Sequence, residues 1–208
     1  MKKTLCFASN NAHKLEEVAD VLGDSFTIQT LADIGCTDEL PETTGTIPGN
    51  SAQKARYVFD HFGVACFADD SGLEVDALNG EPGVDSAFYA GGNKPGEIRS
   101  HAANIALLLK NMGDTLNRRA RFRTVITLVE ADDTGAPVEH QFEGIVAGTI
   151  LTEPHGTGGF GYDPVFMPDG YTQTFAQMSL AEKSKISHRA KALTGLVGYL
   201  RKLKKKGL

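Results

Sequence analysis

Apolar runs and helix-like periodicity alternate through the first part of the chain. Residues 4–8 form a short apolar run suited to a buried strand, and residues 26–31 indicate a second strand. Between them, apolar residues repeat at the spacing of one helical face: Leu15, Val18, Ala19 and Leu22. A strand, a polar turn and an amphipathic helix in this order are typical of the opening of an α/β unit.

The same alternation continues beyond residue 50. Asn50 is a candidate cap for a helix that extends to Phe62. The apolar face of this helix has four members: Ala55, Val58, Phe59 and Phe62. Residues 64–68 predict another apolar strand, which ends directly in an acidic turn over residues 69–72.

The rest of the chain predicts a helix over residues 96–112 and two longer strands over residues 119–130 and 138–150. Ser187 can cap a final helix. The inward face of that helix has four members: Ala190, Leu193, Val197 and Leu200. We therefore expect a single domain over residues 1–208 with an α/β fold, in which helices flank a mixed sheet and two lobes surround a cleft.

Composition narrows the class of protein. The chain of 208 residues is 41% hydrophobic and 23% charged, as soluble globular proteins are, and no apolar stretch is long enough to span a bilayer. Cys6, Cys36 and Cys66 form no CxxC pair, which argues against a disulfide scaffold or zinc site and fits a reducing cytoplasm. The net charge of −5 argues against nucleic acid as a partner.

A glycine-rich segment, GTGGFGYDP over residues 156–164, satisfies the G-x-G-x-x-G pattern of dinucleotide-binding folds. In those folds the glycines follow the first strand and open a helix. Here they lie in the last third of the chain, and Pro164 disfavours a helical conformation at Asp163. The segment is therefore interpreted as a loop whose backbone N–H groups or flat aromatic faces approach a ligand closely.

Two polar clusters follow predicted strands. The segment Ser9–Lys14 enters the first helix, where backbone N–H groups and the Lys14 ammonium suit a polyphosphate, although N-capping by asparagine explains it equally well. Asp69 and Asp70 are costly side by side unless a cation or a proton offsets their charge, although one of them can serve the turn alone. Glu42 is either a further ligand or a solvated loop carboxylate. Oxygen ligands without His or Cys spacing favour Mg²⁺ over zinc.

The last cluster lies at the start of the final helix. Lys183, His188 and Arg189 put positive charge near the positive end of a helix dipole, which is unfavourable without an anionic or carbonyl-bearing ligand. The alternative is a surface group that flanks the helix cap. Taken together, phosphate-type donors, paired carboxylates and an aromatic loop indicate a site for a nucleotide with Mg²⁺.

Five segments in this order resemble the inosine triphosphate pyrophosphatase family, also called dITP/XTP pyrophosphatases: SNNAHKLEEV, FADDSGLEVDAL, PGVDSAFYAGG, GTGGFGYDPVF and EKSKISHRAKAL. The resemblance covers nearly the whole chain. It implies an elongated α/β fold with a long mixed sheet, a nucleotide cleft between two lobes, and a homodimer. It also implies Mg²⁺-dependent hydrolysis of ITP, dITP or XTP to the monophosphate and pyrophosphate, which cleanses the nucleotide pool.

The resemblance also implies roles for individual residues. Asp70 would be the catalytic proton acceptor and, with Glu42, a metal ligand, while Lys14 would stabilise the leaving pyrophosphate. The triphosphate would be bound by Ser9, Asn10, Asn11, Ala12, His13 and Lys14. The base and ribose would be bound by Phe160, Gly161, Tyr162 and Asp163, with Ser71 beside the substrate. Further base and phosphate contacts would come from Lys183, His188 and Arg189.

Two positions depart from the family pattern. Phe88 stands where the family usually has arginine, which bears on substrate affinity or selectivity, and Gly49 stands where many members have glutamate. A septum-inhibitor-type pyrophosphatase acting on modified pyrimidine nucleotides is the nearest rival, and the SHR and FGYD motifs argue against it. A nucleotide-binding sensor without turnover is the other rival. The presence of Lys14, Glu42 and Asp70 argues against it, because binding alone needs no activating carboxylate.

Overall fold

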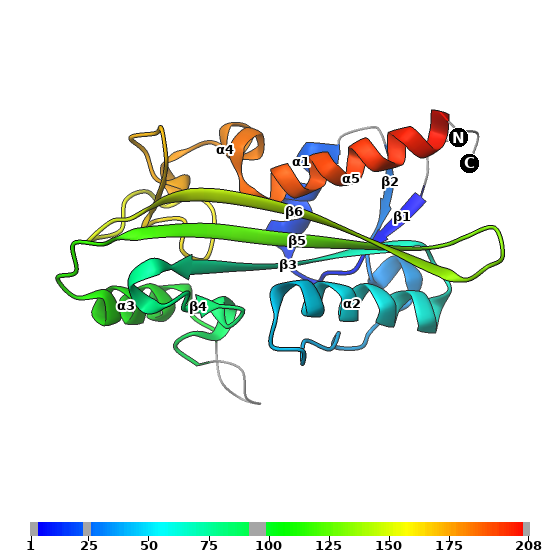
Figure 1. Ribbon diagram of the computed structural model, residues 1–208, viewed down its shortest axis with the longest axis horizontal. Coiled ribbons are helices and arrows are strands. Elements are labelled where there is room, and N and C mark those ends of the chain that lie inside the picture. The colour runs from blue at the N-terminus through cyan, green and yellow to red at the C-terminus, as the bar shows by residue number, and fades with distance from the viewer. Residues whose placement is uncertain (1–3, 23–25, 92–98, 206–208) are drawn as a thin grey trace. The chain divides into compact units, whose positions relative to one another are not determined.

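A computed structural model describes residues 4–22, 26–91 and 99–205, and it shows strands flanked by helices (Figure 1). Contacts between residues divide the chain into two compact units. Unit 1 comprises Met1–Asp70, Thr124–Gly144 and His188–Leu208. Unit 2 comprises Ser71–Arg123 and Ile145–Ser187. No helix of the described residues is long and apolar enough to cross a membrane.

The strands form one mixed sheet in the order β2-β1-β3-β5-β6-β7, with the short β4 paired to β3. Their bounds are β1 Thr4–Phe7, β2 Thr27–Gln29, β3 Cys66–Val75, β4 Pro82–Gly83, β5 Arg119–Ala131, β6 Pro137–Ile150 and β7 Phe166–Pro168. β1 is parallel to β2 and to β3, whereas β4 is antiparallel to β3 and β7 is antiparallel to β6. The predicted α/β class with a mixed sheet is therefore confirmed.

The helices flank the sheet, as expected. Their bounds are α1 Ala12–Leu22, α2 Ile47–Phe62, α3 His101–Met112, α4 Leu180–Ile186 and α5 His188–Lys205. In unit 1, α1 packs beside α5, and Figure 1 shows α2 on the other side of the strands. The apolar patterns that predicted α1, α2 and α5 are thus the patterns that bury these helices against the strands.

Alternation along the strands of unit 1 builds two cores, one on each face. Leu5, Phe7 and Phe67 pack with the apolar residues of α1 and α5. The residues that alternate with these along β1 and β3, including Cys6 and Cys66, pack with the apolar residues of α2. Successive side chains of a strand point to opposite faces, so strands buried on both faces read as continuous apolar runs.

Unit 2 has its own core. It gathers residues of α3, of β3, β5 and β6, and of the segment that follows β6. Phe166 of β7 belongs to this core. The centroid of its ring lies 4.6 Å from that of Phe122 and 5.3 Å from that of Phe175. This core holds the glycine-rich loop in place, because Tyr162 of the loop and Val165, which follows the loop, are both buried in the core.

Several predicted boundaries are wrong. β3 does not end before the acidic pair but continues through Asp69 and Asp70 to Val75, because β4 pairs with its second half. α2 begins at Ile47 with Thr46 as its cap, so Asn50 lies within the helix instead of capping it. α3 begins at His101 with Ser100 as its cap; residues 96–98 of the predicted helix lie outside the described residues.

The predicted inward face of α1 is also wrong at one position. Ala19 is exposed, and Glu17 is buried in its stead. A carboxylate is buried at low cost only when it is paired. Glu17 is paired with Arg189 of α5, as the site below shows.

Candidate functional site

The predicted phosphate-binding segment lies between β1 and α1 in unit 1. The Asn11 side chain accepts a hydrogen bond from the Lys14 N–H at 3.2 Å. This is the N-capping by asparagine that was the alternative to phosphate binding. The Asn11 N–H in turn donates to Ser9 Oγ at 3.2 Å. Asn10, Ala12 and His13 are exposed, so the segment presents polar groups to the surface at the start of a helix.

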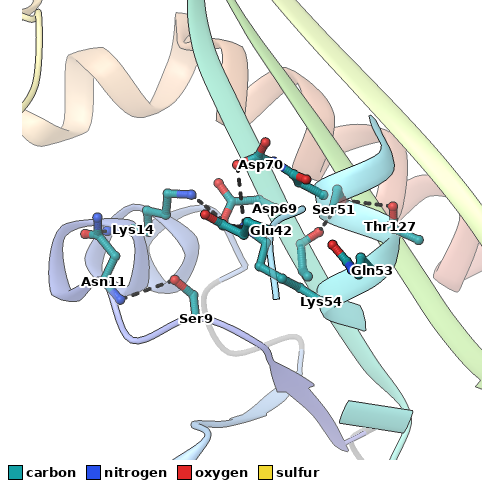
Figure 2. Close-up of polar contacts among 12 residues, drawn as sticks. Ser9, Asn11, Lys14, Glu42, Ser51, Gln53, Lys54, Asp69, Asp70 and Thr127 are labelled. Carbon is teal, nitrogen blue, oxygen red and sulfur yellow. Dashed lines mark hydrogen bonds and ion pairs between the residues drawn. The ribbon is translucent and has the colours of Figure 1, made fainter. Parts of the chain in front are cut away.

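The Lys14 side chain does not extend freely into solvent. Its Nζ donates to Asp69 Oδ1 at 3.0 Å, which Figure 2 shows. Burial lowers the pKa of the Lys14 amine, and the cations Lys54 and Arg189 act in the same direction. A half-buried lysine held by one carboxylate beside a helix N-terminus is a fixed donor for an anion.

Asp69 links Lys14 to the start of α5. Its second oxygen accepts a hydrogen bond from Arg189 Nε at 3.0 Å, and the Arg189 Nη1 atom is paired with Glu17 of α1. Burial alone would raise the pKa of the Asp69 carboxyl, but the charges of Lys14 and Arg189 outweigh it and hold that pKa well below its ordinary value. Four charges therefore alternate in sign, namely the buried Glu17, Arg189 and Asp69 and the half-buried Lys14.

The predicted metal ligands Glu42 and Asp70 are brought together by Lys54 of α2. Lys54 Nζ donates to Glu42 Oε1 and lies 3.5 Å from Asp70 Oδ1 (Figure 2). Burial raises the pKa of the Asp70 carboxyl above its ordinary value, and Glu42 and Asp69 act in the same direction against Lys54 and Lys14. Burial opposes the charge of Lys54, but Asp70, Glu42 and Asp69 outweigh it and raise the pKa of this lysine.

The loop that carries Glu42 is fixed to the first turns of α2. The Thr43 N–H donates to Gln53 Oε1 at 2.8 Å, and Gln53 Nε2 donates back to Thr43 Oγ1 at 2.9 Å. The Thr44 N–H and hydroxyl both donate to Asn50 Oδ1. A Cβ on Gly49 would lie 2.3 Å from Thr44 Oγ1, so the departure at Gly49 lets this loop pack closely on the helix.

The donor set fits a hard divalent cation bound together with phosphate. Among the residues that the structure describes, no three His, Cys, Asp or Glu side chains form a metal-binding group. Asp70 Oδ2, however, is buried and has no hydrogen-bond partner. Because Mg²⁺ is commonly held by one or two carboxylates plus substrate phosphates and water, Glu42 and Asp70 suit such an ion.

A second group of predicted residues lies in unit 2. Asp163 Oδ2 accepts a hydrogen bond from the Phe160 N–H at 2.9 Å and another from Lys183 Nζ at 2.6 Å. The ammonium also lies 5.0 Å from the Phe160 ring centroid, within cation–π range. Gly159 is required here, because its φ is +68° and a Cβ would lie 2.1 Å from Asp163 Oδ2.

Tyr162 and Ser71 have different surroundings within unit 2. The Tyr162 ring lies in the core, and its hydroxyl donates to the Ser86 carbonyl at 2.9 Å. Burial raises the pKa of this phenol well above its ordinary value. Ser71 is a half-buried residue of β3, and Gly161 is half-buried in the loop at φ +62°.

His188 and Arg189 begin α5, directly after Ser187 ends α4. Both side chains are buried in unit 1. The α5 backbone lies close to β6, because a Cβ on Gly144 would come within 2.0 Å of the His188 carbonyl oxygen. This glycine therefore decides how closely the first turn of α5, and with it Arg189, approaches the strand.

A hollow of about 540 Å³ lies beside the glycine-rich loop in unit 2. It is lined by His101, Ile105 and Leu109 of α3 and by the loop from Gly156 to Gly161. The ring centroids of His101 and Phe160 are 6.4 Å apart. Phe88 stands where the family usually has arginine, yet it has a cationic neighbour. The Arg99 guanidinium lies 4.1 Å from the Phe88 ring centroid.

Sequence reasoning missed three members of this site. Lys54 and Glu17 are charged residues that the structure buries in helices, and Asp69 was seen only as one half of an acidic pair. The sequence offered a hint for Lys54 alone. It is the neighbour of Ala55, which belongs to the apolar face predicted for this helix. Pairing partners far apart in the chain were not visible in the sequence.

Comparisons with known proteins find relatives along nearly the whole chain. The model of the Ham1 family matches residues 5–199 of the chain. A protein of Flavobacterium psychrophilum named dITP/XTP pyrophosphatase is 48% identical over 95% of this chain and 98% of its own length. One of Porphyromonas gingivalis with the same name is 47% identical over 94% and 96%. The solved Ham1 protein of Staphylococcus aureus matches with a TM-score of 0.83 at 37% identity, over 96% of this chain and 98% of that one. With its near-complete coverage by the family model and by these relatives, the chain belongs to the Ham1 family.

Proposed function

We propose that this protein hydrolyses dITP, ITP and XTP to the corresponding monophosphate and pyrophosphate. A cluster of charged side chains carries the proposal: Lys14 pairs with Asp69, and Lys54 pairs with Glu42 and with Asp70, the residue next to Asp69. Relatives that share almost the full length of the chain are named for this activity. They also favour it over the rival pyrophosphatase for modified pyrimidine nucleotides.

We assign the catalytic proton transfer to Asp70. Its buried Oδ2 has no hydrogen-bond partner, and its raised pKa makes it a stronger base than an ordinary carboxylate. Such a group can accept the proton of a water that attacks the α-phosphorus, an effect typically worth ~10²–10⁴-fold in rate. A sensor without turnover would have no use for a carboxylate in this condition.

We propose Mg²⁺ as the metal that Glu42 and Asp70 hold. When bound, such an ion polarises phosphate oxygens and lowers the pKa of a coordinated water. Lys14 supplies positive charge for the leaving pyrophosphate, and the α1 N-terminus supplies N–H donors for phosphate oxygens.

We assign the purine base to the group of unit 2. Phe160 provides a flat apolar face, and the Asp163–Lys183 pair provides an acceptor and a donor at 2.6 Å from each other. A site of this kind can bind a base that has a carbonyl group at the six-position. An adenine amino group placed against the Lys183 ammonium would set donor against donor, and unpaired buried donors cost ~1–3 kcal/mol each.

The test is product analysis with five nucleotides: dITP, ITP, XTP, dATP and UTP. With Mg²⁺ present, we expect monophosphate and pyrophosphate from the first three and little turnover of the last two. Diphosphate and orthophosphate as products would contradict attack at the α-phosphorus. Preferred turnover of UTP would support the pyrimidine rival, and binding without any product would support the sensor.

Metal dependence and assembly are separate parts of the proposal. EDTA should abolish turnover and Mg²⁺ should restore it, and activity that survives exhaustive EDTA treatment would contradict the metal site. A homodimer and a cytoplasmic location stay predictions, and sedimentation of the purified chain tests the first.

A further inference from the structure

Lys54 lies where two carboxylates are ready to bind one cation. Its Nζ donates to Glu42 Oε1 and contacts Asp70 Oδ1 at 3.5 Å, and only 8% of its side chain is exposed (Figure 2). The two carboxylates come from separate elements of unit 1, the loop before α2 and strand β3. Their common partner in this arrangement is the lysine ammonium.

The surrounding scaffold fixes this arrangement. Ser51 Oγ, one turn before Lys54 in α2, donates to the Ala68 carbonyl at 3.0 Å and thereby holds the helix against β3. Ser51 Oγ also lies 2.8 Å from Thr127 Oγ1 of β5. On the other side, the Thr43–Gln53 contacts hold the Glu42 loop on the helix. Lys54 therefore has little freedom to leave without a competing attraction.

The site still has unused ligand capacity. Asp70 is 7% exposed, and its Oδ2 has no hydrogen-bond partner. Two carboxylates are few for a divalent cation, since Mg²⁺ prefers six oxygen ligands and takes the remainder from phosphates and water. Without a triphosphate to supply those ligands, the Lys54 ammonium already offsets one of the two negative charges.

We propose that Lys54 holds the cation position between Glu42 and Asp70 until a triphosphate arrives, so that the nucleotide-free chain excludes divalent cations from this site. The inference rests on the proposed function, because it takes a triphosphate to be the substrate. Phosphate oxygens attract the Lys54 ammonium away from the carboxylates and supply the ligands that the metal lacks. Metal and triphosphate therefore bind together, and neither carboxylate is left unpaired at any stage.

Mn²⁺ titration of the nucleotide-free chain tests this directly. Free Mn²⁺ is counted from its electron paramagnetic resonance signal, and no turnover is needed. We expect the parent chain to bind Mn²⁺ only weakly, with Kd near or above about 1 mM, as two carboxylates with a competing cation should. Lys54→Met removes the competing ammonium, and it should tighten binding by about tenfold or more.

Two matched variants separate displacement from a general change in charge. Lys54→Arg keeps a cation beside the same carboxylates and should leave Mn²⁺ binding weak. Lys14→Met removes a positive charge that contacts Asp69 and neither Glu42 nor Asp70, so it should tighten Mn²⁺ binding clearly less than Lys54→Met does. Equal gains in Lys54→Met and Lys14→Met would overturn the proposal.

Two further outcomes also decide the matter. Micromolar Mn²⁺ binding by the parent chain without nucleotide would overturn it whatever the variants do. If Lys54→Met does not fold by circular dichroism, Lys54→Gln replaces it, since an amide keeps donors for Glu42 and Asp70 but carries no charge. Unchanged affinity in a folded neutral variant would contradict the inference. Failure of the proposed function would instead appear as absent dITP hydrolysis, which this titration does not measure.

Discussion

Lys14 and Asp69 are 55 positions apart in the sequence, yet the Lys14 ammonium lies 3.0 Å from Asp69 Oδ1. The aspartate accepts on its other oxygen from Arg189. A lysine that would otherwise sample many rotamers is thereby directed to one place beside the α1 N-terminus. The interactions that prepare the phosphate-binding group are thus long-range ion pairs within unit 1.

Asp70→Asn tests the proton acceptor. The amide keeps the size of the side chain but is not basic and carries no negative charge for a metal. We expect kcat for dITP to fall about a hundredfold or more, with an unchanged circular dichroism spectrum. Asp169→Asn makes the same change at an exposed aspartate paired with Arg119, and it should retain parent activity. Near-normal turnover in Asp70→Asn would remove Asp70 from the mechanism.

Glu17→Gln tests the buried end of the charge chain. Glu17 is a counter-ion of the buried Arg189, and breaking a buried ion pair costs about 3–5 kcal/mol. We expect the free energy of unfolding, measured with urea, to fall by about 3 kcal/mol. Glu16→Gln is the matched control one residue earlier, because the Glu16 side chain is 68% exposed. Equal effects of the two substitutions would show that the buried pair contributes no more than a surface charge.

Glu17→Gln should also affect binding. Arg189 would lose one of its two counter-ions and would keep only Asp69, which it shares with Lys14. We expect KM for dITP to rise more than kcat falls, because the disturbance reaches Lys14 through Asp69. A purely structural role would lower the yield of active enzyme and leave KM unchanged.

The Asp69 carboxyl predicts how stability depends on pH. Its pKa is lowered in the folded chain, because Lys14 and Arg189 outweigh the effect of burial. A carboxyl of this kind stabilises the fold at pH values above its unfolded pKa, and this stabilisation is lost as the pH falls towards the folded pKa. The window of loss therefore lies below about pH 4, the ordinary value for aspartate.

The measurement compares the parent with Asp69→Asn across pH. The difference in free energy of unfolding should be constant from about pH 7 to pH 5 and should shrink as the pH falls below about 4. Groups whose surroundings are the same in both proteins cancel in this difference. A difference that grew on acidification would contradict the lowered pKa.

Gly144→Ala tests the close approach of β6 to α5. The new Cβ would come 2.0 Å from the His188 carbonyl oxygen and 2.6 Å from the Ala192 nitrogen. Both contacts are backbone atoms, so the helix must move, at a cost of about 1–3 kcal/mol. The melting temperature should fall, and KM should rise because Arg189 moves with the helix.

Gly198→Ala is the control for that substitution. Gly198 lies in α5 itself, and a Cβ there meets nothing within 4 Å. Alanine in a helix interior is favoured over glycine by roughly 0.5–1 kcal/mol, so this variant should be at least as stable as the parent. Destabilisation by both variants would show that alanine at a glycine position costs stability whether or not its Cβ meets a neighbour.

The sequence by itself determined the class of fold and most of its elements. Apolar runs, such as the one that became β1, and a 3.6-residue period, such as that of Val18 and Leu22, are local signals read directly from the residues. The same holds for the glycine-rich loop, where the residues around Pro164 exclude a helix. Resemblance to a known family added the expected roles of Lys14 and Asp70.

Only the tertiary structure decided how the charges pair. β3 continues through Asp69 and Asp70 because β4 pairs with its second half. No pattern within the predicted strand indicates that β4 will be its partner. Lys54 and Glu17 are buried because carboxylate or guanidinium partners from distant segments neutralise them. Local sequence sets which residues face a core, but burying a charge depends on a partner that only the folded chain brings near.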